Sequence, residues 1–212
     1  YISSFPQTSE NYELAPLDRM MLAELNRLIG ECKKGYEEMN AFIPANATRE
    51  FTWNIFADHY IEAAKSRAYN REGKFDARLQ RGAWYTLHRC LETLLKLLAP
   101  ICPFMTDAIW LEIYSNESIH SQKFPEEKTE WQSDMSKLLS KFIEFNNTIW
   151  RYKKENGIAL SQKLSVAVYC PQELEPLKDD LMRMHGIGSI QFAEPQDKEV
   201  TKKLSERIFV TE

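Results

Sequence analysis

Residues 91–114 read LETLLKLLAPICPFMTDAIWLEIY, and this stretch decides how the chain is predicted to fold. It is the most apolar run in the sequence, and Pro100 and Pro103 interrupt it near its middle. Proline lacks a backbone donor and its ring clashes with the preceding helical turn, so one helix is expected to end near Leu98 and another to begin shortly after it. Each half is too short to span a bilayer. The stretch therefore predicts a corner between two core helices, and no membrane segment.

The composition predicts a mainly helical protein with a substantial core. Of the 212 residues, 43% are hydrophobic and 12% are aromatic, which argues against disorder. Only 7 residues are glycine, which favours helices over a loop-rich β fold. Because the formal net charge is −4, any site for a polyanion must be local.

Cysteine usage and the start of the chain bear on its cellular setting. The sequence has neither a signal peptide nor a C-x-x-C pair, so the cysteines are expected to be buried, reduced thiols of a cytoplasmic protein. The chain begins at Tyr1 rather than at methionine, which predicts a piece of a longer protein. The four cysteines are Cys32, Cys90, Cys102 and Cys170.

Apolar residues at steps of three and four extend the helical prediction on both sides of the corner. Gly73 and Gly157 are placed where helices are expected to stop. Residues 118–131 contain turn residues and a proline, and are predicted to form an extended crossover. The expected helices cover residues 16–40, 44–70, 76–98, about 100–114, and 133–156.

The composition changes after Gly157, where short β-rich runs alternate with helical patterns. Strands are expected at residues 164–170, 189–193 and 207–210, and helices at residues 171–185 and 197–205. The predicted fold is thus mainly α, a helical bundle with a small C-terminal α/β appendage. Its expected domains are a linker or the end of a preceding helix (1–15), a helical bundle (16–157) and a β-α-β module (158–212).

Motifs for catalysis and metal binding are absent from the sequence. A Walker loop, a nucleophile elbow and an H-E-x-x-H helix are all missing, and Gly186-Ile-Gly188 lacks the third glycine of a dinucleotide loop. The histidines show no ligand spacing with cysteine or acidic partners. The residues therefore predict no catalytic site and no metal site. The histidines are His59, His88, His120 and His185.

Cationic residues are concentrated between residues 65 and 89, where seven basic and two acidic residues give a local charge of +5. Arginine beside exposed aromatic rings is the combination that binds phosphates and stacks unpaired bases. A second cationic patch surrounds the end of the helix predicted at 133–156. The predicted RNA-binding residues are Lys65, Arg67, Tyr69, Arg71, Lys74, Arg78, Arg81, Tyr85 and Arg89, with Arg151, Lys153 and Lys154 in the second patch. The alternative interpretation is a solvated helix surface whose arginines pair with nearby carboxylates.

Four segments, in this order, resemble the C-terminal anticodon-binding region of class I aminoacyl-tRNA synthetases. The segment at 97–110 is shared by the valine, isoleucine and leucine enzymes, and Ser118-Ile119-His120 favours the archaeal-type valine enzymes. A weaker match covers residues 151–160. The four segments are residues 17–26 (with Leu17-Asp18-Arg19), 51–67 (FTWNIFADHYIEAAKSR), 97–110 (LLAPICPFMTDAIW) and 118–125 (SIHSQKFP).

The resemblance implies a helical bundle that docks an anticodon stem-loop, with splayed bases read directly and phosphate contacts positioning the stem. The family attaches an amino acid to tRNA with ATP, using HIGH and KMSKS motifs in a catalytic domain. Neither motif is present in this chain. The run at 134–138 (DMSKL) is similar to the KMSKS motif but lacks both of its flanking residues. The motif residues implied to be structural are Trp53, Tyr60, Phe104 and Trp110.

The expected function is therefore the tRNA-binding part of a valine–tRNA ligase. Its expected partners are tRNA, in particular the anticodon stem-loop of tRNA(Val), and an upstream catalytic domain of the same chain. The resemblance implies ATP and Mg²⁺ as cofactors of the parent enzyme and none for this region. Two alternatives remain: the same region of the isoleucine or leucine enzyme, and a helical protein–protein interaction module.

Overall fold

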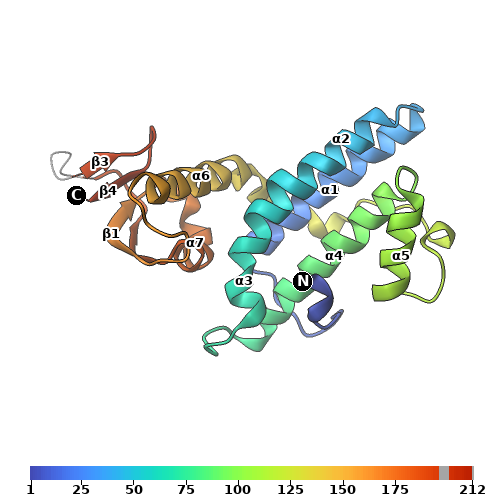
Figure 1. Cartoon of the computed structure of the whole chain (residues 1–212), viewed down its shortest axis with the longest axis horizontal. Helices are drawn as coiled ribbons and strands as arrows, with labels where there is room; N and C mark the ends of the chain where they lie inside the picture. Colours follow the sequence, from blue (N-terminus) through green and yellow to red (C-terminus); the bar gives the residue numbers. More distant parts are fainter. Residues whose placement is uncertain (196–200, 212) are drawn as a thin grey trace. The chain divides into compact units, whose positions relative to one another are not determined.

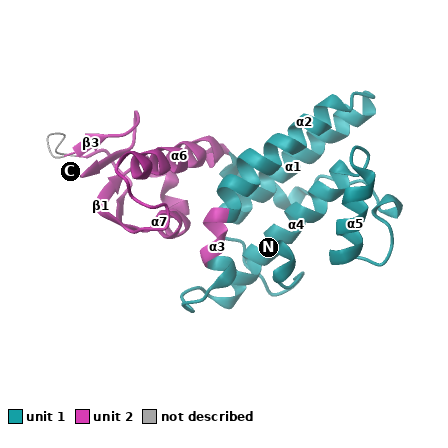
Figure 2. Cartoon of the chain, viewed as in Figure 1, with its two compact units in different colours: residues 1–61, 67–136 teal, residues 62–66, 137–212 magenta. Residues whose placement is uncertain are grey.

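A computed structural model describes residues 1–195 and 201–211 of the chain. The chain divides into two compact units, residues 1–61 with 67–136 and residues 62–66 with 137–212 (Figure 2). Helices build the first unit, and a small sheet with helices builds the second (Figure 1). The prediction of a mainly α fold with a small α/β appendage is confirmed. Within the described residues, no helix is both long and apolar enough to cross a membrane.

The first unit contains the predicted helical corner. Helix α4 (Ala77–Leu98) ends one turn before Pro103 opens α5 (Pro103–Ile113). Trp110 is buried at the corner, and its indole donates a hydrogen bond of 3.1 Å to the Glu117 carbonyl. The other elements of this unit are η1 (Ile2–Ser4), α1 (Pro16–Glu37), α2 (Phe42–Glu50), η2 (Phe51–Ile61), η3 (Ile119–Ser121) and η4 (Thr129–Trp131).

The helix predicted at 44–70 is continuous from α2 through η2 into α3 (Glu62–Tyr69), but η2 is a π-helix. Its i→i+5 bonds wind the backbone more loosely and change which side chains face the core. Tyr60 is fully buried as expected, whereas Trp53 is 66% exposed. Phe104, in the first turn of α5, is 91% exposed. Trp53 and Phe104, which the resemblance implied to be structural, are therefore not buried in the core.

This difference in burial leads to a stability prediction. Trp110→Ala is expected to lower the free energy of unfolding by about 3–5 kcal/mol, because it leaves a cavity at the corner. Trp53→Ala removes a mostly exposed side chain and is expected to change it by about 0.5 kcal/mol or less. Urea unfolding followed by circular dichroism measures both values. Equal losses for the two variants would place Trp53 in the core after all.

A buried ion pair joins the helices of the first unit around Asp18. Arg67 Nη1 and Nη2 donate to the two Asp18 carboxylate oxygens at 2.6 and 2.9 Å, and the Tyr60 hydroxyl donates to the same carboxylate at 2.7 Å. The backbone N–H of Ala15 adds a fourth bond of 3.0 Å. Asp18 is 0% and Arg67 1% exposed. Residues from two of the segments that carry the family resemblance thus meet in one network.

Residues 1–15, predicted as a linker or a helix end, pack along α4. The Glu13 N–H donates to the Arg78 carbonyl at 3.0 Å, and His88 Nε2 donates to the Phe5 carbonyl at 2.9 Å. The two backbones approach so closely at Gly82 that a Cβ there would lie 2.0 Å from the Glu13 carbonyl oxygen. The segment therefore covers part of the α4 surface.

Burial lowers the pKa of His88, and also that of His59, below the ordinary value. As pH falls through the unfolded-state pKa of about 6.5, the unfolded chain binds protons that the folded protein excludes. The free energy of unfolding is therefore expected to decrease from about pH 7.5 to about pH 5.5. In urea titrations across this range, His88→Gln should show a shallower decrease. An unchanged slope would show that His88 is protonated equally in both states.

The second unit holds a four-stranded sheet in the order β2-β1-β4-β3. β1 and β2 are parallel and joined through α7, as the predicted β-α-β module requires, and β4 is antiparallel to both β1 and β3. The predicted helix at 197–205 is wrong for residues 201–203, which form β3 because they pair with β4; residues 197–200 lie outside the described part. The elements are α6 (Leu139–Glu155), β1 (Leu164–Tyr169), η6 (Gln172–Leu177), α7 (Lys178–His185), β2 (Ile187–Gln191), β3 (Thr201–Lys203) and β4 (Phe209–Thr211).

Helix α6 groups with the sheet, so the division at residue 137 differs from the domain boundary predicted after residue 157. The reason is a set of buried polar contacts between α6 and the end of α7. His185 Nε2 lies 2.8 Å from Asn146 Oδ1, and Lys153 Nζ donates to the His185 carbonyl at 2.7 Å. A polar side chain buried on α6 thus finds its partners in the C-terminal part of the chain.

Candidate nucleic-acid interface

Four exposed residues among the predicted RNA contacts lie at the turn between α3 and α4. The Asn70 side chain holds this turn by bonding both the N–H and the carbonyl of Phe75, at 3.0 and 2.9 Å. Asp76 then caps α4 by accepting from the Arg78 N–H at 2.7 Å. The backbone of the turn is therefore fixed. We call Tyr69, Arg71, Lys74 and Arg78, which are all exposed, the cationic loop.

The cationic loop combines positive charge with an accessible ring. The Arg71 guanidinium lies 4.8 Å from the centre of the Tyr69 ring, and Tyr69 is 41% exposed. Lys74 pairs with Glu72, and Arg78 lies 3.9 Å from Glu13; all four of these side chains are more than half exposed. Exposed pairs of this kind contribute little energy and can exchange partners. These cations are available to phosphates.

Two further predicted RNA contacts on α4, Arg81 and Tyr85, are covered by the N-terminal segment, residues 1–15. Arg81 Nε donates to the Asn11 carbonyl at 2.7 Å. Tyr85 is only 6% exposed because the Tyr12 ring stacks on it at 4.2 Å. Tyr85, a predicted RNA contact, therefore lies beneath the N-terminal segment and not on the surface.

Two predicted cations are buried and bind protein groups. Arg67 belongs to the Asp18 network, and Lys153 is 0% exposed. Lys153 Nζ donates to the carbonyls of Leu160, Gln162 and His185 at 2.8, 2.7 and 2.7 Å. Arg67 and Lys153, both predicted RNA contacts, therefore have their charges bound by protein groups inside the fold.

Three predicted cations, Lys65, Arg151 and Lys154, belong to the second unit. Lys65 is partly exposed and pairs with Glu62. In the second unit, Arg151 and Lys154 are exposed, and Arg151 Nη2 donates to the Leu204 carbonyl at 3.3 Å. In the second patch, Arg151 and Lys154 are thus exposed, whereas Lys153 is buried.

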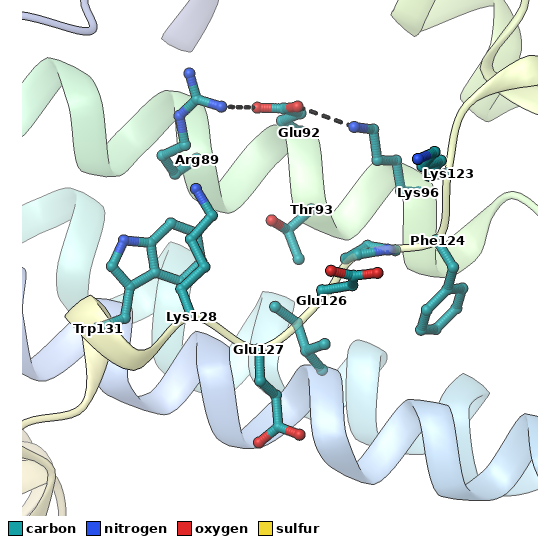
Figure 3. A pocket seen from close by; sticks show the side chains of 12 residues that line it. Arg89, Glu92, Thr93, Lys96, Lys123, Phe124, Glu126, Glu127, Lys128 and Trp131 are labelled. Carbon is teal, nitrogen blue, oxygen red and sulfur yellow. Dashed lines mark hydrogen bonds and ion pairs between the residues drawn. The ribbon is translucent and has the colours of Figure 1, made fainter.

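Arg89 lies in a cleft that the sequence did not predict. The cleft is bounded by α1, α4 and residues 123–131, and its volume is about 340 Å³ (Figure 3). The Glu92 carboxylate lies between Arg89 Nη1 at 2.5 Å and Lys96 Nζ at 3.0 Å. The lining cations are Arg89, Lys96, Lys123 and Lys128.

A sequence signal for this cleft exists but is weak. Arg89, Glu92 and Lys96 follow one another at helical spacing on one face of α4, and the lysines of residues 123–128 come from a crossover far along the chain. Nothing in the local sequence pattern indicates that α4 and residues 123–128 are neighbours in the fold. Lys96, Lys123 and Lys128 are thus functional candidates that the sequence reasoning missed.

The described residues hold no group of three or more histidine, cysteine, aspartate or glutamate side chains placed to bind a metal ion. Cys32, Cys90 and Cys170 are buried, Cys102 is partly exposed, and all four are free thiols.

Known proteins resemble this chain over most of its length. A family model described as the anticodon-binding domain of tRNA ligase matches residues 18–168. The valine–tRNA ligase of Pyrobaculum aerophilum is 39% identical over 90% of the chain and 24% of its own length. Those of Aeropyrum pernix and Archaeoglobus fulgidus are 34% and 29% identical over 87% and 99% of the chain, and over 23% and 24% of their own lengths. The chain spans about a quarter of the length of these relatives.

Proposed function

The chain belongs to the anticodon-binding domain family of tRNA ligases, and on this premise we propose that it binds the anticodon stem-loop of a tRNA. The observation that carries the proposal is the cationic loop, where Arg71 lies over a partly exposed tyrosine and two further exposed cations, Lys74 and Arg78, follow on the same turn. Cations at such a site neutralise phosphates and release counterions, and the ring offers a face to an unpaired base.

The proposed contacts differ in strength along the chain. Arg71, Lys74 and Arg78 bind phosphates, with Tyr69 as the stacking ring. Lys65 and Arg81 are secondary contacts because protein groups already engage them. Arg151 and Lys154 add a smaller cationic site in the second unit.

We further propose that the tRNA is tRNA(Val) and that the parent protein is a cytoplasmic valine–tRNA ligase. The support is the similarity to archaeal valine–tRNA ligases, together with the resemblance carried by residues 118–125. The parent would contain an upstream catalytic domain that uses ATP and Mg²⁺. This chain would contribute tRNA binding and no catalytic group.

Titration with three labelled RNAs tests the proposal. Anticodon stem-loops of valine, isoleucine and leucine tRNAs are added to the protein, and binding is followed by fluorescence anisotropy. The valine stem-loop is expected to bind at least about tenfold more tightly, the ratio that one well-read base supplies. Equal affinities would remove the valine assignment. Absence of binding to all three would favour the protein-interaction module instead.

A further inference from the structure

We propose that the cleft between α4 and residues 123–131 binds one unpaired nucleotide whose base carries an exocyclic amino group. This inference rests on the proposed function, since it names the part of an anticodon loop that the protein would take in. The cleft volume of about 340 Å³ lies at the lower end of the range of roughly 300–1,000 Å³ usual for small-molecule sites. That space suits a single base with its sugar.

The walls of the cleft suit a flat ring. Ile29 is 1% exposed and Thr93 is 6% exposed, and both line the cleft. Phe124 and Pro125 add apolar surface from the crossover, and Phe124 is 37% exposed. A base removed from its stack in a loop recovers apolar and stacking contacts in such a site.

The rim of the cleft suits a phosphate. Lys123 is exposed and makes no ion pair or hydrogen bond through its amine within the described residues. The buried Arg89 Nε–H also has no acceptor there, although its Nη1 binds Glu92. Lys128 Nζ lies 4.6 Å from the centre of the Trp131 ring. Lys96 and Lys128 pair with Glu92 and Glu130, at 3.0 and 3.9 Å, so the unused capacity for a charged acceptor lies with Lys123 and the Arg89 Nε–H.

One carboxylate gives the cleft its base preference. Glu126 lines the cleft and has no hydrogen bond or ion pair among the described side chains. In Figure 3 it lies on the cleft side of the crossover, whereas Glu127 turns toward α1, where its carboxyl group would lie 3.1 Å from a Cβ at Gly30. A carboxylate accepts hydrogen bonds from amino groups such as cytosine N4. Uracil offers only its N3–H, which lies between two carbonyl oxygens that repel a carboxylate, so cytosine, adenine or guanine is preferred.

The test uses the whole chain with short RNAs. Wild-type protein and Glu126→Gln are titrated with hexacytidylate, hexauridylate and the valine anticodon stem-loop, and anisotropy is recorded. Wild type is expected to bind hexacytidylate about tenfold more tightly than hexauridylate, and Glu126→Gln to bring that ratio close to one. Lys123→Glu should weaken binding of both oligomers alike. Glu112→Gln, an exposed carboxylate on α5 outside the cleft, should leave the ratio unchanged.

The outcomes separate this inference from the proposed function. If the wild type binds the stem-loop but shows no preference between the oligomers, or if Glu126→Gln keeps the preference, the inference is overturned and the proposed function stands. If the wild type binds neither the stem-loop nor the oligomers, both fail. Circular dichroism of each variant verifies that the helices are retained.

Discussion

Asp18→Ala is expected to lower the free energy of unfolding of the first unit by about 3–5 kcal/mol, the range typical of breaking a buried ion pair from one side. In this variant the Arg67 side chain, which is 1% exposed, keeps its positive charge. It loses the two hydrogen bonds of 2.6 and 2.9 Å that it donates to the Asp18 carboxylate. It also removes the acceptor of the Tyr60 hydroxyl and of the Ala15 N–H. Three groups from separate parts of the chain lose their common partner.

Urea unfolding followed by tryptophan fluorescence measures this loss. Four of the five tryptophans, Trp53, Trp84, Trp110 and Trp131, lie in the first unit and report its transition. Asp76→Ala is the control, since it removes an exposed N-cap carboxylate and should cost about 1 kcal/mol. A loss for Asp18→Ala no larger than that of the control contradicts the account of the network.

Reversing three charges of the cationic loop, by Arg71→Glu, Lys74→Glu and Arg78→Glu together, is expected to weaken binding of the valine stem-loop by about 100-fold or more. For every phosphate that the variant no longer binds, the slope of log K against log salt should become shallower by roughly 0.7–0.9. The protein should remain folded because all three side chains are exposed. Anisotropy titrations at two salt concentrations give both quantities.

A matched control makes the same change in net charge elsewhere on the first unit. Lys33→Glu, Lys34→Glu and Arg49→Glu replace three exposed cations outside the cationic loop. This variant should lose only the general electrostatic attraction, which salt screens. If both triple variants lose affinity equally, the loop is not the binding site and only the total charge matters.

The helical corner and the long helices could be predicted because their signals are local. Pro103 at the first position of α5 and the three-to-four spacing along α1 and α4 determine those elements without knowledge of the rest. The β1–α7–β2 unit was predicted for the same reason. The π-helix was not, because a change of winding between Phe51 and Ile61 has no residue pattern of its own. The exposure of Trp53 follows from it.

The candidate site was only partly predictable, because a charge pattern does not say where a cation's partner lies. Arg67 and Lys153 look like Arg71 and Lys154 in the sequence, but each finds buried oxygen acceptors that the fold supplies. Tyr85 has the spacing of a surface residue, and a segment about seventy residues earlier covers it. The cleft depends on the meeting of α4 with residues 123–131, which only the tertiary structure shows.

The central claim is that this chain grips RNA phosphates with the cationic loop, and the salt dependence of stem-loop binding tests it most directly. The valine anticodon stem-loop is titrated into the wild-type chain at several KCl concentrations between about 50 and 300 mM. Over such a range, salt strongly weakens binding that depends on phosphate contacts. Log K is expected to fall linearly with log salt, with a slope of about −2 to −3 from three phosphate contacts. Binding that is absent at the lowest salt, or that does not change with salt, would contradict it.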